Sequence, residues 1–354
     1  MSKRIIALLL ALVMVFALCA CGNGGNGGNS AGTEDVGDET YTIRIACENS
    51  DSYPATLGLY QMEKYVESHT NGKVQVEVCA SGQLGGEEET LEQVAQGNLE
   101  MAVASFAPVV SYVPEFEVMD IPFVYNSYTE AWMVLDSYVG TNLLDKMEAQ
   151  GLKGMAYMEN GMRQVTSNVS AINSVADFKG VKLRTMQNNN HMESFSALGA
   201  NPTPVAFSEL YISLSQKVVD AQENPIANVT DKKLYEVQKY LSLTNHIYDA
   251  MPLVCNLEFF NSLPQAYQKV VQAGAIYAQE FSRFCNLERE DLILADLADK
   301  YGMQINEVSA DARAEMAKVA QPAVIKLVAK DIGQDAVDQY MNDVKDVLAQ
   351  ISKF

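Results

Sequence analysis

The chain after residue 40 alternates between two hydrophobic periodicities. Apolar side chains recur at every second position in 41–47 and 73–80, which predicts strands with one buried face. Segments 54–72 and 85–98 carry apolar residues at helical spacing, and 99–105 is a further apolar run that predicts a strand. The order strand, helix, strand, helix, strand is typical of a parallel sheet with helices on its faces.

A second series of predicted strands and helices, with elements of similar length, follows. A Pro-punctuated loop at 114–125 and a helix around Trp132 separate the two series. The second series consists of predicted strands at 152–160, 162–168, 180–186 and 218–224, with a predicted helix at 190–199.

One helical pattern runs through 262–302 with Gly274 as its only internal breaker. A helix of about forty residues would be on the order of 60 Å long, which exceeds one small domain, so we expect it to bridge both units. We therefore predict an α/β fold with two lobes and a cleft between them. Ligands of such sheets bind beyond the carboxyl ends of the strands.

The first forty residues do not belong to this pattern. Lys3 and Arg4 precede an apolar stretch too short for a confident membrane span, so 1–20 is interpreted as an export signal peptide. Cys21 ends a stretch that resembles the lipobox of bacterial lipoproteins, although Cys19 is atypical there. We expect lipidation of Cys21 and a flexible linker over 21–40, with ordinary signal cleavage as the alternative. The G-x-G-x-x-G in this linker lacks the strand and helix that a dinucleotide site requires.

The net charge of the chain limits the kinds of molecule that it can bind. The 354 residues include 45 acidic and 25 basic side chains, for a net charge of -20, and 48% are hydrophobic. Nucleic acid is disfavoured as a partner, because phosphate binding needs clustered Lys and Arg. An anion site would have to be built locally, from a few positive groups in a shielded cleft.

No catalytic or metal-binding motif is present in the sequence. It contains no G-x-S-x-G, H-E-x-x-H, Walker or EF-hand loop, and its three histidines are interpreted as capping or packing residues. The cysteines lack ligand spacing, so we expect neither a metal nor a cofactor. Cys47 and Cys79 close two predicted strands, which makes a disulfide between them geometrically possible if the strands are neighbours, with core packing as the alternative.

Three polar residues fall where apolar runs end, namely Arg163, Arg184 and Asn224. The planar guanidinium of arginine can donate two parallel hydrogen bonds to a carboxylate, which lysine cannot copy. These residues could form an anion site at converging strand ends. Alternatively, the arginines pair with some of the many acidic side chains of the chain.

Seven blocks of the sequence resemble, in order, the extracytoplasmic solute-binding subunits of tripartite ATP-independent periplasmic (TRAP) transporters, the DctP family. The blocks are "NGKVQVEVCASGQLGGEEETLEQVAQGNLEMAVAS", "PEFEVMDIPFVY", "NGMRQVTSN", "FKGVKLRTMQ", "ALGANPTPVAFSELYISL", "VVDAQENPIANV" and "YEVQKYLSLTNHIY". The resemblance covers about 41–290 well and the C-terminal helices loosely.

This resemblance implies a two-lobed, periplasmic-binding-protein-like flytrap that closes on a carboxylate. The arginine of its "K-x-R" strand end, here Arg184, would be the main anchor, supported by Arg163 and Asn224. Other pocket positions of the family fall on Gln187, Phe207, Glu87, Ser105 and Glu48. The loops at Lys217 and Ala221, where the family usually has glycine, depart from its pattern, and "RTMQNNN" lacks a proline often found there.

The implied function is capture of a C4-dicarboxylate or sugar acid outside the cytoplasmic membrane and its delivery to the small and large membrane subunits of a sodium-coupled transporter. We expect a monomer, with lobe I formed by 41–160 plus about 250–289 and lobe II by 161–249 plus about 290–354. A ligand-binding partner of a sensor kinase and an exported hydrolase or lyase are the alternatives.

Overall fold

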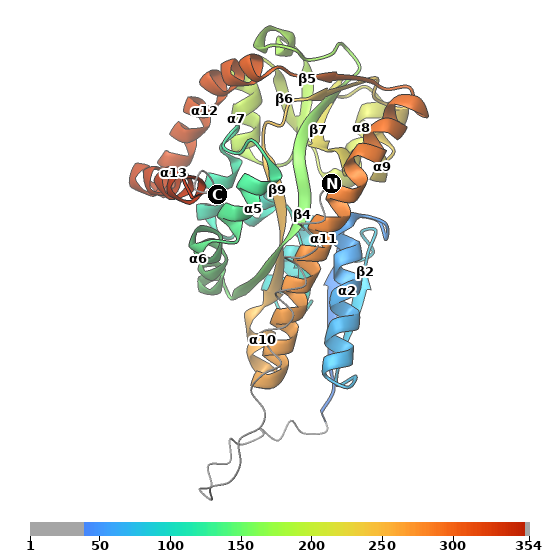
Figure 1. Cartoon of the computed structure of the whole chain (residues 1–354), viewed down its shortest axis with the longest axis vertical. Coiled ribbons are helices and arrows are strands. Elements are labelled where there is room, and N and C mark those ends of the chain that lie inside the picture. The colour runs from blue at the N-terminus through green and yellow to red at the C-terminus, as the bar shows by residue number, and fades with distance from the viewer. Residues whose placement is uncertain (1–38, 351–354) are drawn as a thin grey trace, which may run out of the picture. The chain divides into compact units, whose positions relative to one another are not determined.

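The computed structural model describes residues 39–350, so the predicted signal peptide and the lipidation of Cys21 lie outside the described residues. Figure 1 shows the arrangement of the elements. The strands are β1 (Tyr41–Ala46), β2 (Val74–Cys79), β3 (Met101–Val103), β4 (Leu152–Ser167), β5 (Lys182–Thr185), β6 (Asn201–Pro204), β7 (Ala221–Pro225), β8 (Tyr240–Leu243), β9 (Tyr248–Asn256) and β10 (Gln304–Glu307). The α-helices are α2 (Pro54–His69), α3 (Glu87–Ala95), α4 (Phe106–Val109), α5 (Tyr128–Leu135), α6 (Tyr138–Lys146), α7 (Asn189–Ala197), α8 (Leu210–Ser215), α9 (Ile226–Asp231), α10 (Leu257–Ser262), α11 (Gln265–Asp299), α12 (Ala310–Ile332) and α13 (Gln334–Leu348). Short 3-10 helices are η1 (Pro114–Asp120), η2 (Met147–Gln150), η3 (Val175–Phe178), η4 (Phe207–Glu209) and η5 (Leu234–Glu236).

The first half of the sheet follows the predicted α/β pattern. β1 lies between β2 and β3 and is parallel to both, as the alternation of strands and helices predicts. The backbone N–H of Cys47 donates to the carbonyl of Cys79 at 3.0 Å, so the two strands are neighbours. The cysteines themselves are free and buried, which excludes the possible disulfide and confirms the core interpretation. Beyond β3 the sheet departs from the parallel pattern, because β9 pairs antiparallel with β3 and with β4.

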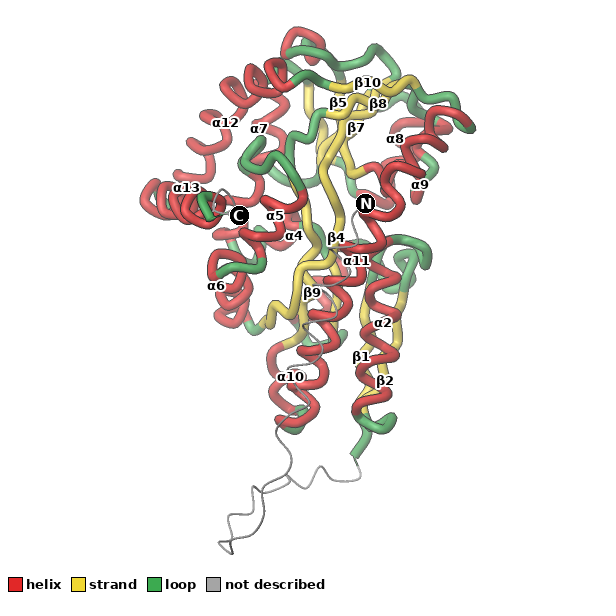
Figure 2. The backbone as a smooth tube through the Cα atoms, viewed as in Figure 1, coloured by secondary structure: helices red, strands yellow, loops and turns green. Residues whose placement is uncertain are grey.

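β4 is a single 16-residue strand where the sequence predicts two. Gly161, which separates the two predicted strands, has φ of +127°, and a register shift against β9 occurs between Glu159 and Gly161. Glycine adopts this backbone conformation without a steric penalty, so the strand bends there and continues. Figure 2 shows β4 running from its pairing with β9 toward β7.

The second half of the sheet begins where β4 changes partners. From Arg163 onward β4 pairs antiparallel with β7, and β8 pairs with its last residues. β5 is parallel to β7 on one side and to β6 on the other, and β10 pairs in parallel with β8. Because β7 adjoins both β4 and β5, Arg184 and Asn224 near the ends of β5 and β7 are brought toward Arg163. Arg163 lies inside β4 and not at a strand end, which corrects the prediction from sequence, because the strand continues past Gly161.

The predicted long helix is α11, which has 35 residues and is preceded by the separate helix α10. α11 packs along α2 and β4, and toward its C-terminal end it packs on α9 (Figure 1). Its Leu297 belongs to a hydrophobic cluster with Leu210, Val229 and Leu241 of the second half. The helix therefore bridges both halves of the sheet, as predicted.

The C-terminal helices join the two halves as well. Met316 and Ala320 of α12 pack with the second half, whereas Val328 of α12 belongs to a large cluster centred on the first half. α13 is amphipathic and buries Val337 and three further apolar residues in that same first-half cluster. This placement differs from the assignment of 290–354 to lobe II by sequence, and the lobe boundaries remain a prediction. Between residues 39 and 350, no helix has the length and apolar character needed to cross a membrane.

Candidate ligand-binding site

A cavity of about 280 Å³ lies where loops of both halves of the sheet meet. Its walls come from the loop after β1, the start of α3, the loop after β5, the segment 205–208 and the β7–α9 junction. The lining includes the predicted binding residues other than Arg163, which are Arg184, Asn224, Gln187, Phe207, Glu87, Ser105 and Glu48. The structure thus brings residues from distant parts of the chain to one cavity, although their contact with a ligand stays a prediction.

Arg184 supplies the positive charge of the cavity. It lies near the end of β5 and is 1% exposed. Its Nε donates to the carbonyl of Val205 at 2.8 Å, which fixes the plane of the guanidinium, while its buried Nη1 has no hydrogen-bond partner. No ion pair joins Arg184 to an acid of the described chain. Burial lowers the pKa of Arg184 to about 10, so the group stays protonated at neutral pH and has donor capacity to offer.

Two carboxylates line the same cavity. Glu87 opens α3, and its Oε1 accepts from the backbone N–H of Ser105 at 3.0 Å and from the Ser105 hydroxyl at 2.9 Å. Glu48 follows β1, and its Oε2 accepts from the backbone N–H of Glu87 at 3.2 Å. The carboxylate of Glu48 thus takes an otherwise unpaired N–H at the helix N-terminus, since the N-cap residue is a glycine. Burial and the neighbouring Glu48 raise the pKa of Glu87 to about 8.

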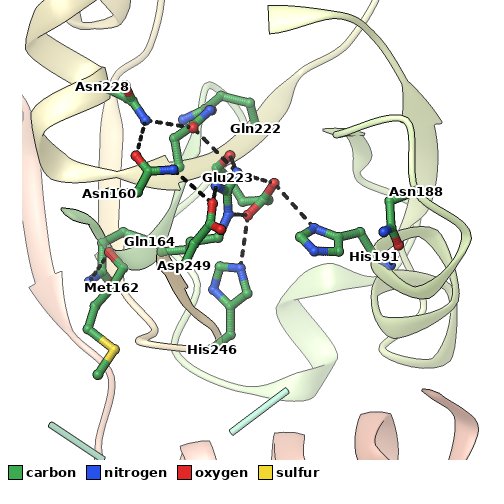
Figure 3. A network of polar contacts seen from close by, with 12 residues as sticks. Asn160, Met162, Gln164, Asn188, His191, Gln222, Glu223, Asn228, His246 and Asp249 are labelled. Carbon is green, nitrogen blue, oxygen red and sulfur yellow. Dashed lines mark hydrogen bonds and ion pairs between the residues drawn. The ribbon is translucent and has the colours of Figure 1, made fainter. Parts of the chain in front are cut away.

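Four asparagines form the wall nearest the bend of β4. The Nδ2 of Asn228 donates to Oδ1 of Asn160 at 3.0 Å and of Asn224 at 3.1 Å, and its Oδ1 accepts from Asn49 at 2.9 Å. Figure 3 shows the bond between Asn160 and Asn228. These side chains come from both halves of the sheet, so the network links the halves beside the cavity.

Arg163 lies behind this wall and does not line the cavity. Its Nε and Nη2 bind the carboxylate of Glu223, its Nη2 also donates to the Glu223 carbonyl at 2.9 Å, and its Nη1 donates to Asp249 at 2.7 Å. Burial alone would lower the pKa of Arg163, but the two carboxylates raise it above its ordinary value. Arg163 is therefore committed to acids of the chain, which is the alternative left open by the sequence, and its contact with a ligand remains a prediction.

Two histidines complete the network around Glu223 (Figure 3). His246 Nε2 lies 3.2 Å from Glu223, and His191 Nε2 lies 3.2 Å from Asp120. Burial alone would lower the pKa of His191, but its hydrogen bond to Asp120 and the carboxylate of Glu223, 3.9 Å from its Nδ1, raise it to about 9. Neither histidine lines the cavity, and both are buried.

Sequence reasoning missed several residues of the lining. Asn49, Asn160, Asn228 and Met251 line the cavity and were not predicted. Two of them carried a usable signal. Asn160 stands at a predicted strand end, and Asn228 lies four positions after Asn224, just beyond another predicted strand end.

A family profile and a characterised relative both identify the same protein family. The profile of the bacterial extracellular solute-binding proteins, family 7, matches residues 45–331. The C4-dicarboxylate-binding periplasmic protein DctP of Rhodobacter capsulatus is 31% identical over 302 residues, which cover 84% of this chain and 90% of that protein.

Two solved structures extend the comparison to the fold. The sugar acid binding protein DctPAm of Advenella mimigardefordensis, in complex with galactonate, aligns with a TM-score of 0.83 and 32% identity over 87% of this chain and 99% of its own. A TRAP periplasmic solute-binding protein of Sulfurospirillum deleyianum with bound succinate aligns with a TM-score of 0.79 and 31% identity over 85% and 98%. The chain belongs to family 7 of the bacterial extracellular solute-binding proteins, the DctP family.

Proposed function

We propose that this protein captures a small organic carboxylate outside the cytoplasmic membrane and delivers it to the membrane subunits of a TRAP transporter for sodium-coupled uptake. Arg184 is the anchor for the carboxylate. The observation that carries the proposal is the buried, cavity-lining guanidinium whose Nη1 has no partner and which no acid of the described chain neutralises.

The chemistry of the anchor supports a carboxylate. A guanidinium held by its Nε presents its two Nη groups as a planar fork, which matches the two oxygens of a carboxylate. A hydrogen bond of this charged kind contributes roughly 1.5 to 3 kcal/mol. The buried charge of Arg184 without a partner costs free energy that a bound anion would recover.

The bend of β4 supports closure of the halves on the ligand. β4 changes partners between Met162 and Arg163, next to the register shift at Gly161. Asn160 and Asn224 face the cavity from the two sides of this crossing. A ligand that bonds to groups of both halves favours the state in which all of them reach it.

Membrane attachment and the lack of turnover belong to the same proposal. Lipidated Cys21 would tether the exported protein to the outer face of the cytoplasmic membrane through the linker 21–40.

The proposal is binding of the acid without its conversion, and no histidine lines the cavity to act as a general base. The alternative role in signalling would be favoured by a neighbouring gene for a sensor kinase in place of genes for two membrane subunits.

Calorimetry on two lysine variants tests the anchor, with D-galactonate and succinate as probes. Arg184→Lys should fold and lose most of its affinity, because an ammonium cannot reproduce the fork. Arg163→Lys should lose less affinity and more stability, since it leaves buried Glu223 and Asp249 with fewer donors. Arg44→Lys, at a surface ion pair with Glu100, is the matched control and should bind like the wild type. Near-native binding by both Arg184→Lys and Arg163→Lys would refute the assignment.

A further inference from the structure

The charges that line the cavity are unevenly divided. Arg184 is its only basic side chain in the part of the chain that the structure describes, whereas four glutamates contribute to the lining. Glu88 and Glu89 are exposed at the mouth, where water and salt screen them. Glu48 and Glu87 are the two that remain in the shielded part. A ligand anchored at Arg184 therefore extends toward negative charge.

Glu48 has an acceptor that the protein does not use. The residue is 7% exposed, and while its Oε2 accepts from the backbone N–H of Glu87, its buried Oε1 has no hydrogen-bond partner. A buried carboxylate oxygen without a donor costs free energy. No ion pair connects Glu48 with Arg184, although the positive charge of Arg184 acts on it. Both residues line the cavity, and each has a buried polar atom that the protein leaves unpaired, Oε1 of Glu48 and Nη1 of Arg184.

Protonation of Glu87 does not remove the negative charge of the Glu48 and Glu87 pair. The Oε1 of Glu87 is occupied by two donors of Ser105. Burial and Glu48 raise the pKa of Glu87 to about 8, so Glu87 is mostly protonated at neutral pH. Burial also raises the pKa of Glu48, while the charges of Lys232 and Arg184 oppose that shift. Two adjacent carboxyl groups that share one proton still carry about one negative charge. The part of the lining formed by Glu48 and Glu87 therefore keeps an acceptor, the unpaired Oε1 of Glu48.

Between residues 39 and 350, no second cation lines the cavity to receive another ligand carboxylate. The nearest candidate, Lys232, has its Nζ 4.6 Å from the centre of the Phe207 ring and is not part of the lining. Its charge acts on Glu48, which further disfavours a ligand ammonium group beside that residue. A neutral O–H donor fits there better than either a carboxylate or an ammonium.

Building on the proposed function, we infer that the ligand is a monocarboxylate with several hydroxyl groups, a sugar acid, whose carboxylate binds Arg184 and whose hydroxyl donates to Oε1 of Glu48. Glu48 is then a specificity-determining residue that disfavours dicarboxylates. A site built to receive a hydroxyl discriminates strongly against analogues that lack it, because its polar group is left unpaired. A like charge placed against Glu48 adds repulsion.

Calorimetry at pH 7 with D-galactonate, succinate and L-glutamate tests this inference on the wild type. We expect D-galactonate to bind at least about tenfold more tightly than either other acid. Tighter binding of succinate or of L-glutamate would overturn the inference and leave the carboxylate-binding function standing. Binding of none of these three acids or of any acid in a wider carboxylate library would instead overturn the proposed function itself.

Glu48→Gln tests the role of that side chain. The amide keeps the size but removes the charge, so the preference for D-galactonate over succinate should fall at least about tenfold. Glu92→Gln, at an exposed position of α3 outside the lining, should keep the wild-type preference. Far-UV circular dichroism and thermal melting without ligand show whether each variant is folded. A folded Glu48→Gln protein with an unchanged preference would contradict the inference, and if that variant does not fold, the wild-type comparison decides alone.

Discussion

Arg163 and Arg184 are both fully buried, yet their guanidinium groups have opposite surroundings. Glu223 and Asp249 neutralise Arg163, whereas Arg184 has a backbone carbonyl as its hydrogen-bond partner. Burial lowers the pKa of Arg184, while for Arg163 the effect of the two acids exceeds that of burial. An arginine with matched charges stabilises the apo fold. An arginine without them is a site for an anion, and this contrast is the basis of the assignment.

A third buried charge, Glu159, gives a prediction about pH. It is fully buried in β4, and its Oε2 accepts from Trp132 at 2.7 Å and from Tyr248 at 3.0 Å. Burial raises the pKa of Glu159 to about 7, with Arg283 opposing and Glu290 reinforcing the shift. The folded state therefore holds this proton to higher pH than the unfolded state. Its contribution to stability is present below the ordinary range of a glutamate and is lost as pH rises through about 7.

Urea unfolding of the apo protein at pH 5, 6, 7 and 8 measures this loss. The free energy of unfolding should decrease with rising pH, and the decrease should be smaller in Glu159→Gln, by at most about 1.4 kcal/mol per pH unit between pH 5 and 7. Glu258→Gln changes an exposed glutamate of α10 and should keep the wild-type slope. Equal slopes in wild type and Glu159→Gln would show that Glu159 does not titrate in this range.

The site was only partly predictable at this scale. Strand ends and residue types indicated Arg184 and Asn224, and both line the cavity. The partners of Arg163 could not be predicted, since Asp249 lies far along the chain and meets it only through the pairing of β9 with β4. The unpartnered oxygen of Glu48 likewise depends on tertiary contacts that periodicity does not encode.

Among the elements, the packing of α11 against α2 depends on glycine. A Cβ on Gly58 of α2 would lie 2.5 Å from the carbonyl oxygen of Ala278 in α11. A Cβ on Gly274 of α11 would lie 2.8 Å from a methyl group of Val66 in α2. The two glycines therefore let the backbones of these helices approach closely, and α11 keeps its position along the first half of the sheet.

Gly58→Ala should destabilise the protein by about 1 to 3 kcal/mol, because the added methyl meets a backbone atom that cannot turn away. The intrinsic preference of alanine for helices would by itself have the opposite sign. Lys64→Ala, at an exposed position of the same helix, is the control and should change the free energy of unfolding little. A neutral or stabilising Gly58→Ala in urea unfolding would show that the helices can separate at no cost.

The elements were predicted best where periodicity is strong. β1, β2, α2, α3 and the long helix follow from the sequence, since each has one buried face of clear period, and β3 follows from a short apolar run. β9 was missed, because it is buried along its whole length and shows no alternation. β4 was divided in two at Gly161, since a glycine inside an apolar run ordinarily ends a strand. Lys217, where the family usually has glycine, has φ of +57°, so this loop keeps the glycine-like backbone without the residue.

For the whole molecule, the net charge of -20 disfavours the approach of an anion, whereas Arg184, the one cationic side chain among the described residues that line the cavity, attracts it. The acidic surface repels an approaching anion at long range, but at physiological salt this repulsion is screened within about 8 Å. Inside the cavity, the nearby positive charge of Arg184 determines whether an anion binds. The two halves of the sheet are linked by β4, β9 and α11, and both contribute residues to the cavity that Arg184 lines. An acid bound to Arg184 can therefore contact both halves and hold them together.

A crystal structure of the protein with D-galactonate tests the central claim most directly. We expect the ligand carboxylate within hydrogen-bond distance of both Nη atoms of Arg184, in a cavity narrowed by closure of the two halves. A complex in which Arg184 pairs with glutamates of the chain, while the carboxylate of the ligand lies elsewhere, would contradict the account.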